Sequence, residues 1–155
     1  MSSPNARIDF DVFCKLAPEA LGAMMSVVKA IDESGVLGKD LLELVKLRAS
    51  QINGCTFCVK HHLMMARKLG VDATKIDLTA VWHDAEVFSE RERAALAWTE
   101  SLTNVATQGA SDSLYENLKK NFSEKEIVFL TLAVGGINSW NRLGVGLRFS
   151  DPPQG

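Results

Sequence analysis

Residues 41–69, LLELVKLRASQINGCTFCVKHHLMMARKL, decide the fold. Apolar residues recur there at the spacing of an amphipathic helix, over 41–52 and again over about 55–69. The pair Asn53-Gly54 between the two stretches favours a tight turn. The segment therefore predicts two consecutive helices, with Cys55 and Cys58 in the first turn of the second.

The rest of the chain keeps the helical period, and no run of four or more residues alternates as a strand would. Capping-box spacing at Ser89-Glu92 and Ser123-Glu126 marks two further helix starts. The other helices are predicted over 10–16, from Pro18 to just before Gly35, over 72–81, from Ser89, from Ser111 or Ser113 to about Lys120, and over 124–148. We expect an all-α fold in a single domain over 1–155, with its core at about 10–148 and a flexible tail at 151–155.

Composition narrows the classes of partner. The chain has 155 residues, 46% hydrophobic and 23% charged, with a net charge of −2. This balance argues against a broad surface for nucleic acid or an anionic membrane. The most apolar stretch, 127–137, is too short to span a bilayer, and the N-terminus lacks the apolar region of a signal peptide. We therefore expect a cytoplasmic protein with no nucleic-acid or membrane partner.

Cys55 and Cys58 are the first candidates for chemistry. In a cytoplasmic protein, a close cysteine pair is more often catalytic or metal-binding than structural. On a helix, Cys58 lies about 60° from Cys55 and His62 about 20° from it, whereas His61 lies about 120° away. A helix start favours a thiolate, and His62 can move a proton near neutral pH. The spacing predicts a redox-active dithiol with His62 as its partner.

Two other interpretations of the cysteine pair stay open, a metal site and inert packing. Half of a zinc site would need two further ligands, and the remaining cysteine and histidines have no second pair at zinc spacing. Glu43, on the preceding helix, either belongs to a solvated face salt-bridged to Lys39 and Lys46 or faces the dithiol and relays a proton. Spacing alone does not choose between these roles of Glu43.

Several residues are expected to be structural. The stretch 127–137 is apolar on all sides, which predicts a central or interface helix. The polar group Trp140-Asn141-Arg142 that follows it is expected to form a structural or subunit-interface network around a buried arginine. Trp82, Trp98 and the five methionines are assigned to the core, Cys14 is assigned as an inert buried thiol, and His83 is assigned to the surface.

The spacing Glu43, then eleven residues, then Cys55-x-x-Cys58-x-x-x-His62 resembles the AhpD-like alkylhydroperoxidase core family, part of the carboxymuconolactone decarboxylase superfamily. Segments 88–96 and 138–143 look like recurrent family segments, so the resemblance covers roughly 10–148. It implies an all-α homo-oligomer, a trimer or hexamer, that reduces hydroperoxides with a thiol or dithiol reductant and without a metal or other cofactor. The sequence departs from the family at Phe57, where a histidine can stand between the cysteines, and this loss is expected to weaken the proton relay.

The resemblance also implies a role for each matched residue. Cys58 would attack the peroxide and become a sulfenic acid. Cys55 would donate a proton and then resolve Cys58 as a disulfide, with Glu43 and His62 completing the proton relay. The alternatives are a non-catalytic oligomeric module that senses redox state or holds a metal, and a carboxymuconolactone decarboxylase-like enzyme, which does not depend on the dithiol.

Overall fold

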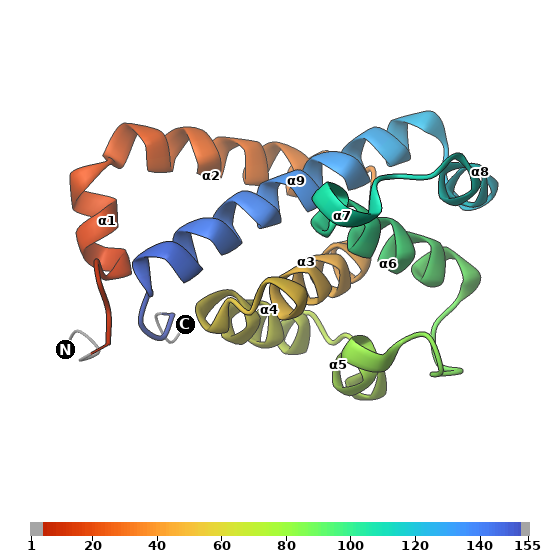
Figure 1. Ribbon diagram of the computed structural model, residues 1–155, viewed down its shortest axis with the longest axis horizontal. Coiled ribbons are helices and arrows are strands. Elements are labelled where there is room, and N and C mark those ends of the chain that lie inside the picture. Colours follow the sequence, from red (N-terminus) through yellow and green to blue (C-terminus); the bar gives the residue numbers. More distant parts are fainter. Residues whose placement is uncertain (1–4, 153–155) are drawn as a thin grey trace.

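The computed structural model describes residues 5–152, and within this range every regular element is a helix (Figure 1). The all-α prediction is confirmed there. The elements are α1 (Phe10–Leu16), α2 (Pro18–Glu33), α3 (Lys39–Asn53), α4 (Thr56–Lys68), α5 (Ala73–Leu78), the 3₁₀ turn η1 (Thr79–Val81), α6 (Glu90–Thr103), α7 (Val105–Gln108), α8 (Asp112–Asn121) and α9 (Glu124–Leu147).

Local sequence signals set most of these boundaries. Both predicted capping boxes form. The Ser89 and Ser123 side chains accept hydrogen bonds from the backbone N–H groups of Glu92 and Glu126, and the side chains of these glutamates accept from the backbone N–H groups of the serines. Ser111, rather than Ser113, caps α8. The short α7 was not predicted, because its four residues carry too little periodicity to stand out.

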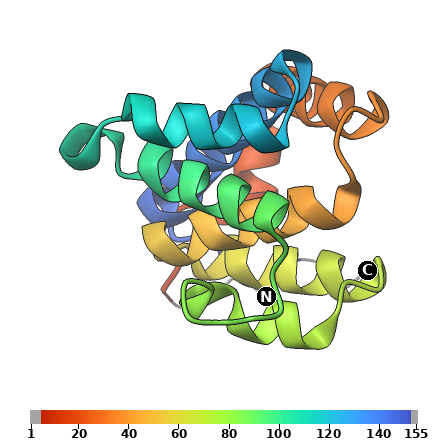
Figure 2. The same ribbon diagram turned by 90° about the vertical axis from the view of Figure 1, so that its right-hand side faces the viewer.

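α3 is the central helix of the domain. It packs against α4, α6 and α9. The helix α2 lies along the side of α9 that faces away from α3 (Figures 1 and 2). Most of α3 is buried, including its charged residues Glu43 and Lys46. The prediction of a central or interface helix for 127–137 also holds, because α9 packs against α2, α3, α4, α6 and α8 and leaves Val128 and Leu132 exposed in the single chain.

The predicted burial of the tryptophans is confirmed, whereas the predicted burial of the methionines and of Cys14 is wrong. Trp82 and Trp98 are buried, as predicted, and the His83 side chain is 62% exposed. The methionines are not core: Met25 is exposed, and the other three in the described range are partly exposed. Met1 lies outside the described residues. Cys14 is a free, partly exposed thiol rather than a buried one, because the short α1 buries none of its residues.

Residues 151–155 are described only in part. Asp151 forms an ion pair with Lys60 of α4, and Pro152 is buried. Residues 153–155 lie outside the described range, so the flexible tail stays a prediction. None of the helices within 5–152 is long and apolar enough to cross a membrane.

Candidate active site

The two cysteines sit where α3 turns into α4. Gly54 ends α3 with φ +66°, a left-handed conformation that glycine adopts without a steric penalty. Cys55 is the N-cap of α4, and its Sγ accepts a hydrogen bond from the Cys58 backbone N–H at 3.3 Å. The Cys55–Cys58 pair is a disulfide with a Cα–Cα distance of 5.3 Å. In the reduced protein, the free N–H groups and the dipole of this helix start stabilise a thiolate.

α9 closes over the disulfide at a glycine. A Cβ atom on Gly144 would lie 2.5 Å from Cys55 Sγ and 3.4 Å from Cys58 Sγ. The shorter distance is below van der Waals contact, and a bonded sulfur has little freedom to retreat. Gly144 therefore allows the α9 backbone to lie directly against the sulfur atoms.

Asparagines fasten the turn to α9. The Asn53 amide donates to the side-chain oxygens of Asn138 and Asn141, both at 2.9 Å. The fully buried Asn141 in turn donates to Ser50 Oγ at 3.0 Å. The structural network expected around 140–142 is thus built by Asn141. The prediction that Arg142 is buried in this network is wrong, because Arg142 is exposed and donates hydrogen bonds to Asn138 of its own helix.

Glu43 is the centre of a buried charge network. Its Oε2 lies 2.7 Å from Nδ1 of His62, and its Oε1 accepts from the Lys46 ammonium at 3.2 Å. The same ammonium donates to Asp32 of α2 at 3.3 Å. Glu43 and His62 are 6% and 8% exposed, so the solvated-face reading of Glu43 is wrong.

This environment lowers the pKa values of Glu43 and His61. Burial acts to raise the pKa of Glu43, but the His62 hydrogen bond, the His62 charge and Lys46 outweigh it, so this pKa lies below its usual value. Burial lowers the pKa of His61, with a further contribution from the His62 charge. Glu43 is therefore ionised and His61 is a neutral imidazole at pH 7.

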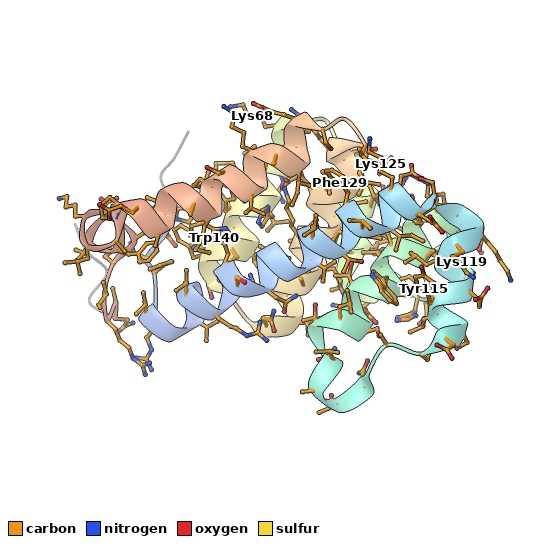
Figure 3. The ribbon with its side chains drawn as sticks, turned by 90° about the horizontal axis from the view of Figure 1, so that it is seen from above. Lys68, Tyr115, Lys119, Lys125, Phe129 and Trp140 are labelled. Atoms are coloured by element: carbon orange, nitrogen blue, oxygen red, sulfur yellow. A yellow bond between two sulfur atoms is a disulfide. The ribbon has the colours of Figure 1, made fainter. Side chains whose placement is uncertain are left out.

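A cavity of about 570 Å³ opens beside the disulfide between α2, α4 and α9. Its volume falls in the range of small-molecule sites. Figure 3 looks onto α2 and α9, with Trp140 labelled on the α9 side. Most of the lining is apolar, and the polar lining side chains come from α2 (Asp32), α3 (Lys46), α4 (Cys58, His61, His62) and α9 (Ser139). Cys58 lines the cavity, whereas Cys55 is 1% exposed and is not among the lining residues.

The structure brings the four sequence-predicted residues into one neighbourhood. Cys55 and Cys58 are bonded to each other, His62 lines the same cavity as Cys58, and Glu43 bonds His62. The sequence paired Lys46 with Glu43 through their i,i+3 spacing, but as part of a solvated face rather than of a buried site. Gly144 under the sulfurs and His61 in the cavity were missed, because both depend on how α2 and α9 pack. Within 5–152, no group of three or more His, Cys, Asp or Glu side chains is placed to hold a metal ion.

The fold and the site define an all-helical protein with a cysteine pair at a helix start, backed by a buried Glu-His pair. Residues 18–101 match the carboxymuconolactone decarboxylase family, and the chain belongs to that family. The AhpD-like resemblance drawn from the sequence is confirmed.

Two similar proteins support this placement, and a third shares the fold. The uncharacterized protein YdfG of Bacillus subtilis (strain 168) is 33% identical over 135 residues, which cover 87% of this chain and 91% of YdfG. A solved structure from Agrobacterium tumefaciens, of unknown function and described as a candidate AhpD antioxidant defence protein, is 41% identical with TM-score 0.90 and covers 97% of this chain and 100% of its own. The debrominase Bmp8, 18% identical with TM-score 0.82, covers 91% of this chain and 75% of its own, and shares the fold.

Gly144→Ala tests the contact between α9 and the sulfurs. The new methyl group meets Cys55 Sγ, so we expect the oxidised protein to lose about 1–3 kcal/mol of unfolding free energy. The matched control is Gly135→Ala on the same helix, where a Cβ meets nothing within 4 Å and helix propensity predicts a gain of about 0.5–1 kcal/mol. Denaturant unfolding of both oxidised variants measures the difference; equal stabilities would contradict the contact.

The depressed pKa of Glu43 predicts an acid-labile fold. A carboxyl group whose pKa is lower in the folded state contributes stability above its unfolded pKa, near 4.5, and this stability is lost as pH falls through the folded pKa. The unfolding free energy of the wild type should therefore fall as pH drops below about 4.5. Glu43→Gln, which cannot ionise, should show a shallower slope in the same pH window. Identical slopes in urea titrations at each pH would show that Glu43 is not a linked group.

Proposed function

We propose that this protein is a thiol-dependent peroxidase that reduces organic hydroperoxides through a Cys55/Cys58 dithiol–disulfide cycle. The observation that carries the proposal is the position of Cys58, which lines an apolar cavity while its bonded partner Cys55 lies behind it. An attacking sulfur must meet the peroxide, and a resolving sulfur needs only to reach the attacking one.

The reaction begins with the reduced pair. His62, held by Glu43, takes the Cys58 thiol proton, and the thiolate attacks the terminal oxygen of the hydroperoxide. The O–O bond breaks, which gives a sulfenic acid on Cys58 and an alkoxide that takes the Cys55 proton to become an alcohol. The Cys55 thiolate then attacks the sulfenic sulfur. The disulfide forms, and the released hydroxide takes the proton held by His62 to become water.

The Glu43–His62 pair suits these proton transfers. An ionised carboxylate 2.7 Å from Nδ1 fixes the orientation of the imidazole. The His62 hydrogen bond and then Lys46, whose ammonium lies 3.2 Å from the other oxygen, hold the pKa of Glu43 below its usual value. The relay therefore depends on contacts from both α3 and α4.

The cavity favours an organic peroxide over hydrogen peroxide. Aromatic rings gather beside the cysteines: Phe57 lies 5.1 Å from Phe10 and 5.4 Å from Phe149, measured between ring centroids. All three line the cavity, together with apolar side chains of α2. Such walls bind an apolar organic group and leave the peroxide oxygens to the polar side chains of α4.

The cycle closes when an external thiol or dithiol reduces the disulfide. We place the protein in the cytoplasm, where thiol reductants keep such a pair cycling. A redox sensor would form the same disulfide without repeated turnover, so sustained turnover is the observation that separates an enzyme from a sensor. A decarboxylase would not need either cysteine.

The cysteine roles predict different defects. Cys58→Ser should abolish peroxide consumption in an assay supplied with a dithiol such as dithiothreitol. Cys55→Ser should instead form one sulfenic acid on Cys58, which a dimedone-type reagent traps and mass spectrometry locates, because no resolving thiol is present. Cys14→Ser, at a free cysteine on α1, is the matched control and should keep full activity.

The opposite result would reverse these assignments. A sulfenic acid trapped on Cys55 in the Cys58→Ser variant, with unchanged peroxide reactivity, would make Cys55 the attacking residue. Full turnover in both single variants would remove the dithiol from the mechanism.

The proposed enzyme is a homo-oligomer, a trimer or hexamer. The support is a pair of exposed apolar side chains one turn apart on α9, Val128 and Leu132, which are 54% and 47% exposed. Covering these side chains in an assembly would remove apolar area from water. Light scattering at micromolar concentration should give a mass of at least three 16.9 kDa chains. A stable monomer would contradict the proposal, and Leu132→Lys should shift a true oligomer toward smaller species.

A further inference from the structure

A second imidazole, that of His61, reaches the cavity beside Cys58. His61 lies three residues after Cys58 on α4, and both side chains line the cavity with Phe57. Residues three and four apart on a helix share a face, which explains why one cavity receives all three. In the sequence, the angle of about 120° between His61 and Cys55 argued against His61 as a partner of the dithiol. Cys58 lies between the two, about 60° from each, so His61 is on the Cys58 side of the helix.

The two neighbouring histidines are held differently. Nδ1 of His62 is bonded to Glu43, whereas no hydrogen bond within residues 5–152 engages a ring nitrogen of His61. The His61 ring contacts the His62 ring edge-on, with 5.0 Å between centroids. His61 is therefore oriented by packing, and its nitrogens remain available to a molecule in the cavity.

The charges around His61 come from three helices. α2 supplies Asp32, α3 supplies Glu43 and Lys46, and α4 supplies His62, while the cavity residues of α9 are uncharged. Burial, His62 and Lys46 favour the neutral ring, and Glu43 opposes them. A neutral imidazole carries one N–H group, and such a group can stabilise a developing oxyanion without giving up its proton.

We propose that His61 is a further catalytic residue, whose N–H donates a hydrogen bond to the alkoxide oxygen as the O–O bond breaks. The assignment rests on the proposed peroxidase function and leaves its proton balance unchanged, because the alkoxide still takes its proton from Cys55. His61 lowers the barrier by stabilising negative charge on the leaving oxygen. It also gives the site an imidazole on the cavity face where Phe57 presents none.

The test compares leaving groups in a single turnover. The reduced enzyme is mixed with tert-butyl hydroperoxide, whose leaving group is a basic alkoxide, or with peracetic acid, whose leaving group is a weakly basic carboxylate. The oxidation rate of Cys58 is followed by quenching and mass spectrometry. His61→Leu should lose about 10²–10³-fold with the alkyl hydroperoxide and less than tenfold with the peracid. His61→Gln, whose amide keeps an N–H donor, should recover part of the loss.

His83→Leu is the matched control, since His83 is an exposed histidine bonded to Glu100 away from the cavity. It should match the wild type with both oxidants. If the wild type reacts but His61→Leu loses the same factor with both oxidants, or loses nothing, the role of His61 is overturned and the peroxidase function stands. If wild-type Cys58 reacts with neither oxidant, the proposed function fails and the role of His61 fails with it.

Discussion

The arrangement of this domain depends on one buried charge. Glu43 lies on the central helix, and a carboxylate removed from water is strongly destabilising unless it is paired. Its partners are Lys46 of the same helix and His62 of α4, and the Lys46 ammonium extends the network to Asp32 of α2. Three helices are thereby fixed around one carboxylate, and two of them, α2 and α4, form walls of the cavity. The network that keeps the charge stable also sets the position of the imidazole beside the dithiol.

A second constraint holds α9 against the sulfur atoms. Asn53 ends α3 and bonds two asparagines of α9, so the turn that precedes Cys55 cannot move independently of that helix. Because Gly144 lacks a side chain, α9 continues past the disulfide in close contact. The disulfide is therefore shielded on one side by backbone and open on the other to an apolar cavity. A reactive cysteine pair needs two conditions: a rigid support for the sulfur atoms and an open side from which a substrate can reach them.

The parts of this arrangement that sequence could predict are those set by local rules. The capping boxes, the Asn53-Gly54 turn and the placement of the cysteines at a helix start follow from neighbouring residues and hold in the structure. Glu43 was ambiguous because an isolated helix cannot tell which of its faces another helix will cover. The same reason explains the methionines: their apolar character predicts burial, but α2 presents Met24 and Met25 to a cavity rather than to the core. Packing between distant segments decides such residues.

The packing around Phe57 gives a physical reason for an apolar side chain between the two cysteines. Phe57 contributes its ring to an aromatic group with Phe10 and Phe149, which come from the two ends of the chain. A charged or strongly hydrated side chain there would have to be desolvated against these rings, at a cost that grows as the site becomes more apolar. Polar side chains line the cavity one turn further along α4, where His61 follows and where Lys46 and Asp32 contribute from α3 and α2. Apolar rings and polar side chains are thus separated by a single helical turn on one face of α4, which is the arrangement that the proposed peroxidase function requires.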